Sequence, residues 1–163
     1  MSTEKPKLYM ICGISGSGKT FYAKKLEQRG VLRLSIDEEL WPDFFVLDPL
    51  LSAEHKAMLK EQAMARIKSR AANIVAAGRS VCIDMPFCKR AQRDGFRSFA
   101  AEIGAEPVLV YLQADLPVLK ERLAAREGKN GPNALPVLEA ELLRYWNGFE
   151  RPDADENPLA PEE

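Results

Sequence analysis

A glycine-rich run near the N-terminus carries the clearest chemical signal in the chain. Residues 13–20 read Gly-Ile-Ser-Gly-Ser-Gly-Lys-Thr and match the pattern Gly-x-x-x-x-Gly-Lys-Ser/Thr. In such a loop the backbone N–H groups point at phosphate oxygens, the lysine reaches the β and γ phosphates, and the last hydroxyl binds Mg²⁺. We therefore expect a nucleoside triphosphate and Mg²⁺ to bind to Gly13, Ser15, Gly16, Ser17, Gly18, Lys19 and Thr20.

Two aspartates follow strand-like runs and are candidates for chemistry beside that loop. Ligands of open α/β sheets bind beyond the carboxyl ends of the strands, so we expect Asp37 to accept a proton from an acceptor hydroxyl. The alternative is a helix N-cap, with Glu38 in the first turn. Asp84 is expected to hold Mg²⁺ through water or to contact the acceptor, and its alternative is a turn before Pro86.

Basic residues on two predicted helices complete the candidate site. Lys89, Arg90 and Arg93 stand near a helix N-terminus, where cations oppose the helix dipole, so we expect them to bind an anionic acceptor. A solvated basic face is the alternative. Arg122 and Arg126 share a helix face ahead of a glycine-rich segment, which suits a lid closing over phosphates. A solvated charged helix is the alternative there.

Strand-like and helical runs alternate along the chain. The apolar runs 8–12, 31–36, 80–83 and 107–112 are expected to be strands. The runs 21–28, 52–77, 89–103, 115–126 and 136–149 are expected to be helices. This alternation predicts an α/β fold with a parallel sheet covered by helices on both faces. The sheet has four expected strands, and a fifth is left open.

The chain length and composition fit one domain. With 163 residues and 46% hydrophobic composition, the sequence predicts a single domain over residues 1–150. Residues 151–163 are rich in proline and acid, which predicts a disordered tail.

The composition also limits the partners. The net charge of −1 favours neither nucleic acid nor membranes, although a local basic cluster leaves nucleic acid open. No apolar run approaches the roughly 20 residues that span a bilayer, and the N-terminus lacks a signal-peptide core. We therefore expect a cytoplasmic protein without a membrane partner, whose thiols are reduced. No Asn-Lys-x-Asp or Asp-x-x-Gly motif occurs, which favours ATP over GTP.

Taken together, these residues resemble a family of small kinase-like ATP-binding proteins, the AAA-33 or zeta-toxin-like group. Polynucleotide 5′-kinase and chloramphenicol phosphotransferase are similar. The resemblance covers about residues 7–150 and is carried by the phosphate loop, Ser35-Ile36-Asp37-Glu38, Ile83-Asp84-Met85-Pro86-Phe87 with the basic residues after it, and Glu121-Arg122-Leu123-Ala124-Ala125-Arg126.

The resemblance implies a P-loop NTPase fold, adenylate-kinase-like, with three α/β/α layers and a helical lid. It implies ATP-dependent phosphorylation of a hydroxyl on a small-molecule or nucleotide-type acceptor, with Lys19, Asp37, Arg122 and Arg126 in catalytic roles. Leu40 stands where polynucleotide kinases carry an arginine, and the family's final strand looks missing. A non-catalytic ATP-binding switch and a zeta-toxin-like nucleotide-sugar kinase are the alternatives. The apolar segment Trp41 to Leu51 is expected either to line an acceptor pocket or to pack in the core.

Overall fold

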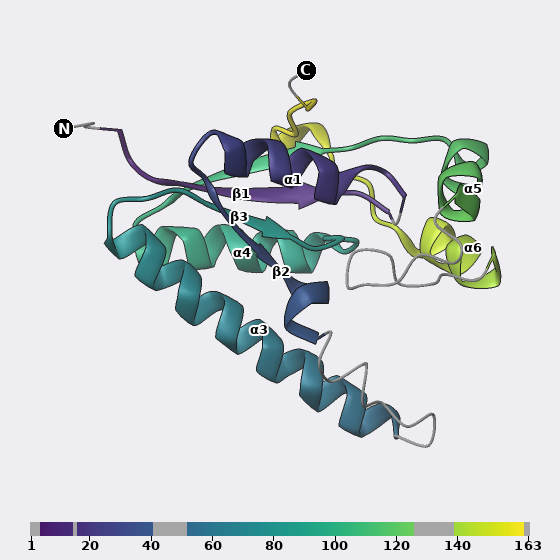
Figure 1. Ribbon diagram of the computed structural model, residues 1–163, viewed down its shortest axis with the longest axis horizontal. Helices are drawn as coiled ribbons and strands as arrows, with labels where there is room; N and C mark the ends of the chain where they lie inside the picture. Colours follow the sequence, from purple (N-terminus) through teal and green to yellow (C-terminus); the bar gives the residue numbers. More distant parts are fainter. Residues whose placement is uncertain (1–3, 15, 41–51, 126–138, 162–163) are drawn as a thin grey trace.

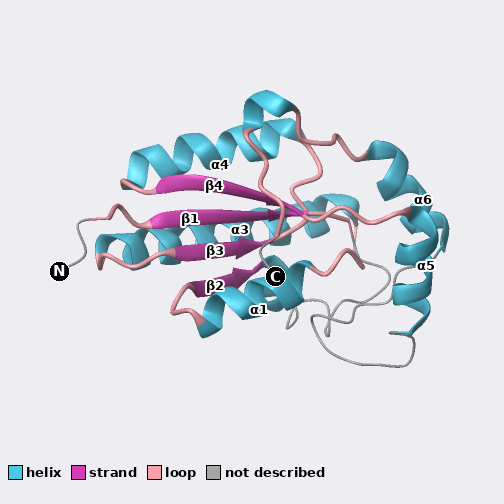
Figure 2. Ribbon diagram, turned by 90° about the horizontal axis from the view of Figure 1, so that it is seen from above, coloured by secondary structure: helices cyan, strands magenta, loops and turns pink. Residues whose placement is uncertain are grey.

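The computed structural model describes residues 4–14, 16–40, 52–125 and 139–161. The expected strands all form: β1 (Lys7–Cys12), β2 (Leu32–Ser35), β3 (Val81–Asp84) and β4 (Glu106–Tyr111). They make one parallel sheet in the order β2-β3-β1-β4, which Figure 2 shows from above. The α/β class and the four-stranded parallel sheet predicted from the sequence are confirmed.

Helices cover both faces of this sheet. The helix α1 (Lys19–Gln28) lies on one face, and α3 (Ala53–Ala76) and α4 (Arg90–Ile103) lie on the other (Figure 1). Two further helices, α5 (Leu116–Ala125) and α6 (Glu139–Gly148), pack on each other beyond the carboxyl ends of the strands. A short 3₁₀ helix, η2 (Ala154–Glu156), follows near the end of the chain. None of the helices in the described ranges has the length and apolar composition needed to cross a bilayer.

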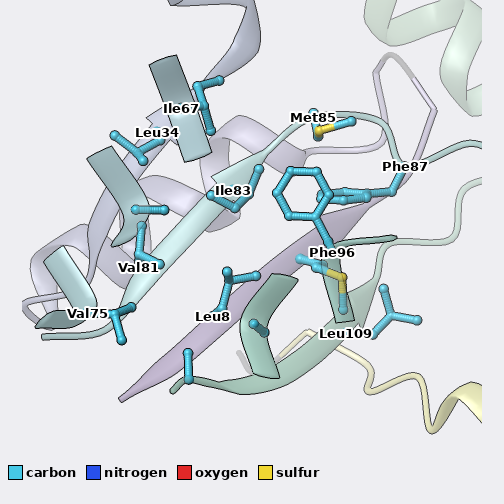
Figure 3. Packing of buried hydrophobic residues seen from close by; sticks show 14 of the residues in the cluster. Leu8, Leu34, Ile67, Val75, Val81, Ile83, Met85, Phe87, Phe96 and Leu109 are labelled. Atoms are coloured by element: carbon cyan, nitrogen blue, oxygen red, sulfur yellow. The ribbon is translucent and has the colours of Figure 1, made fainter. Parts of the chain in front are cut away.

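The core is split by the sheet into two apolar layers. Side chains alternate along β1, so Leu8 and Met10 face α3 and α4, whereas Ile11 faces α1. In the larger layer, Phe87 and Phe96 meet edge to face with ring centroids 5.2 Å apart (Figure 3). All four residues of β3 are buried, as expected for a central parallel strand. This packing fixes the carboxyl ends of β1 and β3, from which the candidate site extends.

The long helix α3 forms as expected, and it buries the apolar face that the helical spacing of Ile67, Ala71 and Val75 predicts. Ser52 caps it by accepting a hydrogen bond from the His55 N–H at 3.1 Å, and Ile67, Ala71 and Val75 are buried against the sheet. On α6 the spacing of Leu138, Leu142, Tyr145 and Phe149 predicts one apolar face, which is only partly right. Leu142 is buried, but Tyr145 is 43% exposed and Trp146 packs inward in its place.

The C-terminal segment, residues 150–161, differs from the disordered tail that the sequence predicts. It contains η2, and Leu159 forms an isolated parallel bridge with Val110 at the free edge of β4. The Tyr111 N–H donates to the Leu159 carbonyl at 2.9 Å, and the Leu159 N–H donates to the Leu109 carbonyl at 2.9 Å. The segment holds few apolar residues, and its composition therefore predicted disorder. Backbone pairing and ion pairs order it without an apolar core. A single residue thus takes the place beside β4 that a fifth strand would fill.

Candidate active site

The loop between β1 and α1 has the curled backbone that phosphate binding needs. Gly16 and Gly18 have φ values of +88° and +97°, which favour glycine. The Gly13 N–H donates to the Pro86 carbonyl at 3.1 Å, which ties the loop to the segment after β3. A Cβ at Gly13 would lie 2.4 Å from Ser17 Oγ, so this loop leaves room for glycine alone. Ser15 lies outside the described residues.

The buried hydroxyl of Ser17 is an orphaned polar group inside the loop. Among the described residues, Ser17 Oγ is the buried side-chain polar atom without a hydrogen-bond partner. Lys19 Nζ donates to the Ile14 carbonyl at 3.5 Å, the long limit of a hydrogen bond. Buried polar groups are normally satisfied, so an orphaned hydroxyl inside a glycine-rich curl fits a loop built around a polar ligand. The residues present therefore fit a nucleotide phosphate.

The hydroxyl of Thr20 meets the carboxylate of Asp84, as the pattern of the two motifs suggests. Thr20 Oγ1 donates to Asp84 Oδ2 at 3.0 Å, and Asp84 is 4% exposed. The register of β1 and β3 places Ile11 opposite Asp84, which brings the end of β3 beside the loop. Mg²⁺ prefers oxygen ligands and is commonly held by one or two carboxylates together with substrate phosphates. Thr20 and Asp84 fit such a metal, whose bound form would neutralise charge on the transferring phosphoryl group.

Arg33 is a site residue that the sequence analysis missed. Its Nε and one terminal nitrogen donate to Asp84 Oδ2 at 3.1 Å and 2.9 Å, and the other terminal nitrogen donates to Glu38 Oε1 at 2.8 Å. Burial alone would lower the pKa of the guanidinium, but its bonds to Glu38 and Asp84 outweigh burial and raise that pKa. The sequence did hold a sign of this role, because Arg33 stands between two leucines in a predicted strand. A cation buried in a strand requires an anion beside it.

Asp37 lies at the carboxyl end of β2, in the first turn of a short helix over residues 36–40. Its side chain is exposed to solvent. The Glu38 N–H donates to Ser35 Oγ at 3.3 Å, so Ser35 occupies the capping role that the alternative reading gave to Asp37. Glu39 pairs with Arg66 and Arg70 of α3, which fixes the short helix against α3. Asp37 is thus displayed at the sheet edge where ligands bind.

Arg122 of α5 reaches across to the phosphate loop. Its guanidinium donates to the Gly16 carbonyl at 3.0 Å. Because α5 packs here, a Cβ at Gly16 would also lie 3.4 Å from the Leu119 carbonyl. An arginine held at the loop is placed to contact a bound phosphate. Arg126 and the expected lid segment lie outside the described residues, as does the apolar segment Trp41 to Leu51.

The three basic residues after β3 are not arranged as an acceptor site. Arg93 is completely buried, where it donates to both carboxylate oxygens of Glu156 at 2.7 Å and 3.1 Å and to the Phe87 carbonyl at 2.8 Å. Arg90 pairs with the C-terminal segment at Asp153 and Asp155. At the start of α4, Lys89 contacts Gly148 and Glu150, and the backbone N–H of Arg90 donates to Glu150.

Carboxylates of this chain therefore pair with these cations, in the place where an anionic acceptor was expected. Burial alone would raise the pKa of the Glu156 carboxyl, but hydrogen bonds from Arg93, Arg97 and the Asp153 N–H outweigh burial and lower that pKa to about 2. Arg93 is a structural cation in this fold, and we correct its expected role in acceptor binding. The sequence pattern showed the cations but gave no sign that their partners lie about 60 residues further on.

A cavity of about 270 Å³ adjoins the phosphate loop on the side of β4. Ile14 and Ser17 of the loop, Leu119 of α5 and Trp146 of α6 contribute to its walls. The Arg151 guanidinium lies 5.2 Å from the centre of the Trp146 ring at the same place. Walls of this kind can hold a flat apolar group beside a bound phosphate chain.

Burial disfavours the thiolate form of the cysteines near the site. Burial raises the pKa of the Cys12 thiol to about 12, only partly offset by the charge of Arg93, so that thiol stays protonated at neutral pH. Burial likewise raises the pKa of Cys88. All three cysteines are free thiols, as the sequence predicts.

A curled glycine loop before α1, a lysine and a threonine at its end, and an acid at the end of the neighbouring strand define a P-loop protein. The family AAA_33, described as an AAA domain, matches residues 8–152. The chain belongs to this family, which confirms the resemblance drawn from its motifs. No curated protein matches the chain significantly.

Solved P-loop kinases share the fold. A gluconokinase from Sinorhizobium meliloti is 22% identical with a TM-score of 0.64, over 96% of this chain and 82% of its own. A sugar kinase from Janibacter is 21% identical with a TM-score of 0.68, over 95% of this chain and 84% of its own. The APS kinase of Mycobacterium tuberculosis, in complex with AMPPNP and APS, is 21% identical with a TM-score of 0.60, over 98% of this chain and 90% of its own. At these identities the likeness establishes the adenylate-kinase-like P-loop fold.

Proposed function

We propose that this protein is an ATP-dependent phosphotransferase that moves the γ-phosphoryl group to a hydroxyl of a small-molecule or nucleotide-type acceptor. The observation that carries the proposal is the meeting of three elements at one sheet edge. The phosphate loop presents Lys19 and Thr20, β3 ends at Asp84 against Thr20, and β2 ends beside the exposed Asp37. The kinase names of the similar structures, among them a gluconokinase and an APS kinase, support the same class of reaction.

Each residue has a separate task in the proposed reaction. The loop N–H groups and Lys19 bind the phosphates, and Arg122, already at the Gly16 carbonyl, closes on the charge of the transferring group. Thr20 and Asp84 would hold the metal. Asp37 accepts the acceptor hydroxyl proton while the new bond from that oxygen to phosphorus forms and the bond to the ADP oxygen breaks. Catalysis of this kind is mostly positioning and charge stabilisation, which a small domain can supply.

A non-catalytic ATP switch is the rival reading, and the experiment must separate the two. The protein is incubated with ATP, Mg²⁺ and a small-molecule extract, and mass spectrometry follows metabolites that gain one phosphoryl group. The proposal expects a product that forms with the wild-type protein and not with Lys19→Ala or Asp37→Asn. If ATP binds and no metabolite gains a phosphoryl group beyond the Lys19→Ala background, the switch reading replaces the enzyme.

A further inference from the structure

The buried guanidinium of Arg33 shares one carboxylate oxygen with the expected metal-binding hydroxyl. Thr20 Oγ1 and two nitrogens of Arg33 all donate to Asp84 Oδ2, over distances of 3.0 Å, 3.1 Å and 2.9 Å. The side chains of Arg33 and Asp84 are each 4% exposed, so solvent screens this pair only weakly. The carboxylate beside Thr20 is therefore neutralised by the protein itself.

A second ion pair holds the guanidinium in place. The remaining terminal nitrogen of Arg33 donates to Glu38 Oε1 at 2.8 Å. Glu38 belongs to the helix over 36–40, which Glu39 fixes to α3 through Arg66 and Arg70. The planar fork of arginine can reach two carboxylates at once, which a lysine ammonium cannot do with the same geometry. Arg33 is thus held in a fixed position beside the expected metal site.

The positive charge of Arg33 repels a divalent cation that binds without nucleotide. A cation on Thr20 Oγ1 would come next to Asp84 Oδ2 and would meet the guanidinium that already occupies that oxygen. Within the described ranges, no group of three His, Cys, Asp or Glu residues is placed to hold a metal. In the protein alone, Arg33 therefore opposes a bare cation beside Asp84, whereas a bound triphosphate would supply several negative charges.

We propose that Arg33 orders ligand binding at this site: it suppresses binding of a free divalent cation, so the metal enters together with the triphosphate. The inference rests on the proposed function, because it concerns how that site loads its metal. Arg33 is a positioning residue here, since it acts through Asp84 and not on the phosphates. A merely structural Arg33 would affect stability and leave metal affinity unchanged.

Binding of Mn²⁺ alone, followed by electron paramagnetic resonance without nucleotide, tests the inference. The wild-type protein should bind Mn²⁺ weakly, and Arg33→Gln should bind it at least about tenfold more tightly. Arg33→Lys keeps the charge but not the planar fork, so it should bind Mn²⁺ less tightly than Arg33→Gln. Asp84→Asn added to Arg33→Gln should abolish the gain, which locates the ion. The matched control Glu38→Gln removes the other carboxylate of the same guanidinium and should not tighten Mn²⁺ binding.

The same titrations with AMPPNP separate this inference from the proposed function. If AMPPNP binds with Mn²⁺ but Arg33→Gln and the wild type hold free Mn²⁺ equally, the role of Arg33 is overturned and the phosphate site stands. If AMPPNP binds neither with nor without metal, the proposed function fails. If Arg33→Gln does not fold, binding of free Mn²⁺ to the wild type and to Asp84→Asn tests the inference. Tight binding of free Mn²⁺ that Asp84→Asn removes overturns the inference, and weak binding that AMPPNP strengthens at least about tenfold supports it.

Discussion

Asp37 is the residue whose substitution separates an enzyme from a nucleotide-binding module. The change Asp37→Asn keeps the shape of the side chain and removes the proton acceptor. Since general-base assistance is worth about 10²- to 10⁴-fold, we expect phosphotransfer to fall by that order while ATP affinity stays unchanged. Turnover with the identified acceptor and ATP affinity should be measured on the same preparation.

The control for this prediction is Asp94→Asn, which changes a carboxylate on α4 that pairs with Arg90 and Arg97. It should leave turnover intact. Because Ser35 accepts the hydrogen bond at the start of the 36–40 helix, a change in stability of Asp37→Asn cannot be explained by loss of that cap. Full turnover in Asp37→Asn would remove Asp37 from the mechanism and shift attention to Asp84.

Gly13 and Gly95 make a matched pair for testing the phosphate loop. A Cβ at Gly13 would meet Ser17 Oγ at 2.4 Å and the Leu112 carbonyl at 3.0 Å, whereas a Cβ at Gly95 in α4 would meet nothing within 4 Å. Gly13→Ala should cost about 1–3 kcal/mol of stability and weaken ATP binding, because the loop must shift. Gly95→Ala should stabilise by up to about 1 kcal/mol and leave ATP binding unchanged.

Urea unfolding and ATP titration of both variants measure the two effects. Equal ATP affinity in Gly13→Ala and Gly95→Ala would show that the close packing around Gly13 is not needed for binding. At this scale the sequence predicted the curled backbone of the loop, because Gly16 and Gly18 adopt positive φ values that favour glycine, while the ligand contacts of the loop stay a prediction. Arg33 escaped prediction because its role depends on a carboxylate about 50 residues further along the chain.

The C-terminal segment is the element whose structure the sequence misrepresented. Glu156 neutralises the fully buried Arg93 and also accepts from Arg97 at 2.7 Å. Glu156→Gln removes the charge and leaves Arg93 buried without a counterion, so we expect a loss of about 3–5 kcal/mol in the free energy of unfolding. Asp153→Asn, a change at a 73% exposed carboxylate of the same segment, should cost less than about 1 kcal/mol. Similar losses in the two variants would contradict the buried role of Glu156.

The same ion pair predicts how stability depends on pH. The pKa of Glu156 is lowered from its ordinary value of 4.5 to about 2 in the folded protein. A lowered pKa means that the stabilisation is fully present above about pH 4.5 and is lost as the pH falls toward 2. The difference in unfolding free energy between wild type and Glu156→Gln should therefore shrink over this range. A difference that stays constant from neutral pH to about pH 2 would contradict the shift.

Composition explains why this element was predicted as disordered while α3 was predicted correctly. The helix α3 buries a periodic apolar face, with Ile67, Ala71 and Val75 at helical spacing, and such a pattern can be read locally. The C-terminal segment is held by ion pairs to α4 and by the backbone bridge of Leu159 to β4. Neither has a local sequence signature, because both depend on partners supplied by distant elements.

The whole molecule has the P-loop fold, and at the outer edge of β4 it has a single bridging residue in place of a fifth strand. The order β2-β3-β1-β4 places β3 beside β1, so the acid after β3 meets the loop after β1. The alternation of strands and helices predicted a parallel sheet, whose strands direct their carboxyl ends to one edge, but it did not predict the strand order. The acceptor could not be predicted, because the specificity of such folds lies in segments that vary independently of the sheet.

Binding of ATP should stabilise the whole domain. A ligand that binds only the folded protein adds about 2.7 kcal/mol when its concentration is 100 times its dissociation constant. We therefore expect ATP with Mg²⁺ to raise the melting temperature, and GTP to raise it less because no guanine-reading motif is present. Differential scanning fluorimetry with the two nucleotides at equal concentration checks this. Equal shifts would contradict the preference for adenine.

Binding of the triphosphate by Gly13 to Thr20, with Lys19 serving phosphoryl transfer, is the central property proposed for this protein. Calorimetric titration of ATP with Mg²⁺ into wild type and Lys19→Ala, with turnover measured on the same samples, tests it. We predict that the wild type binds ATP, and that Lys19→Ala loses turnover severely and affinity to a lesser degree, because the γ-phosphate loses its positive partner. Absence of ATP binding to the wild type, or full affinity and full turnover in Lys19→Ala, would contradict the account.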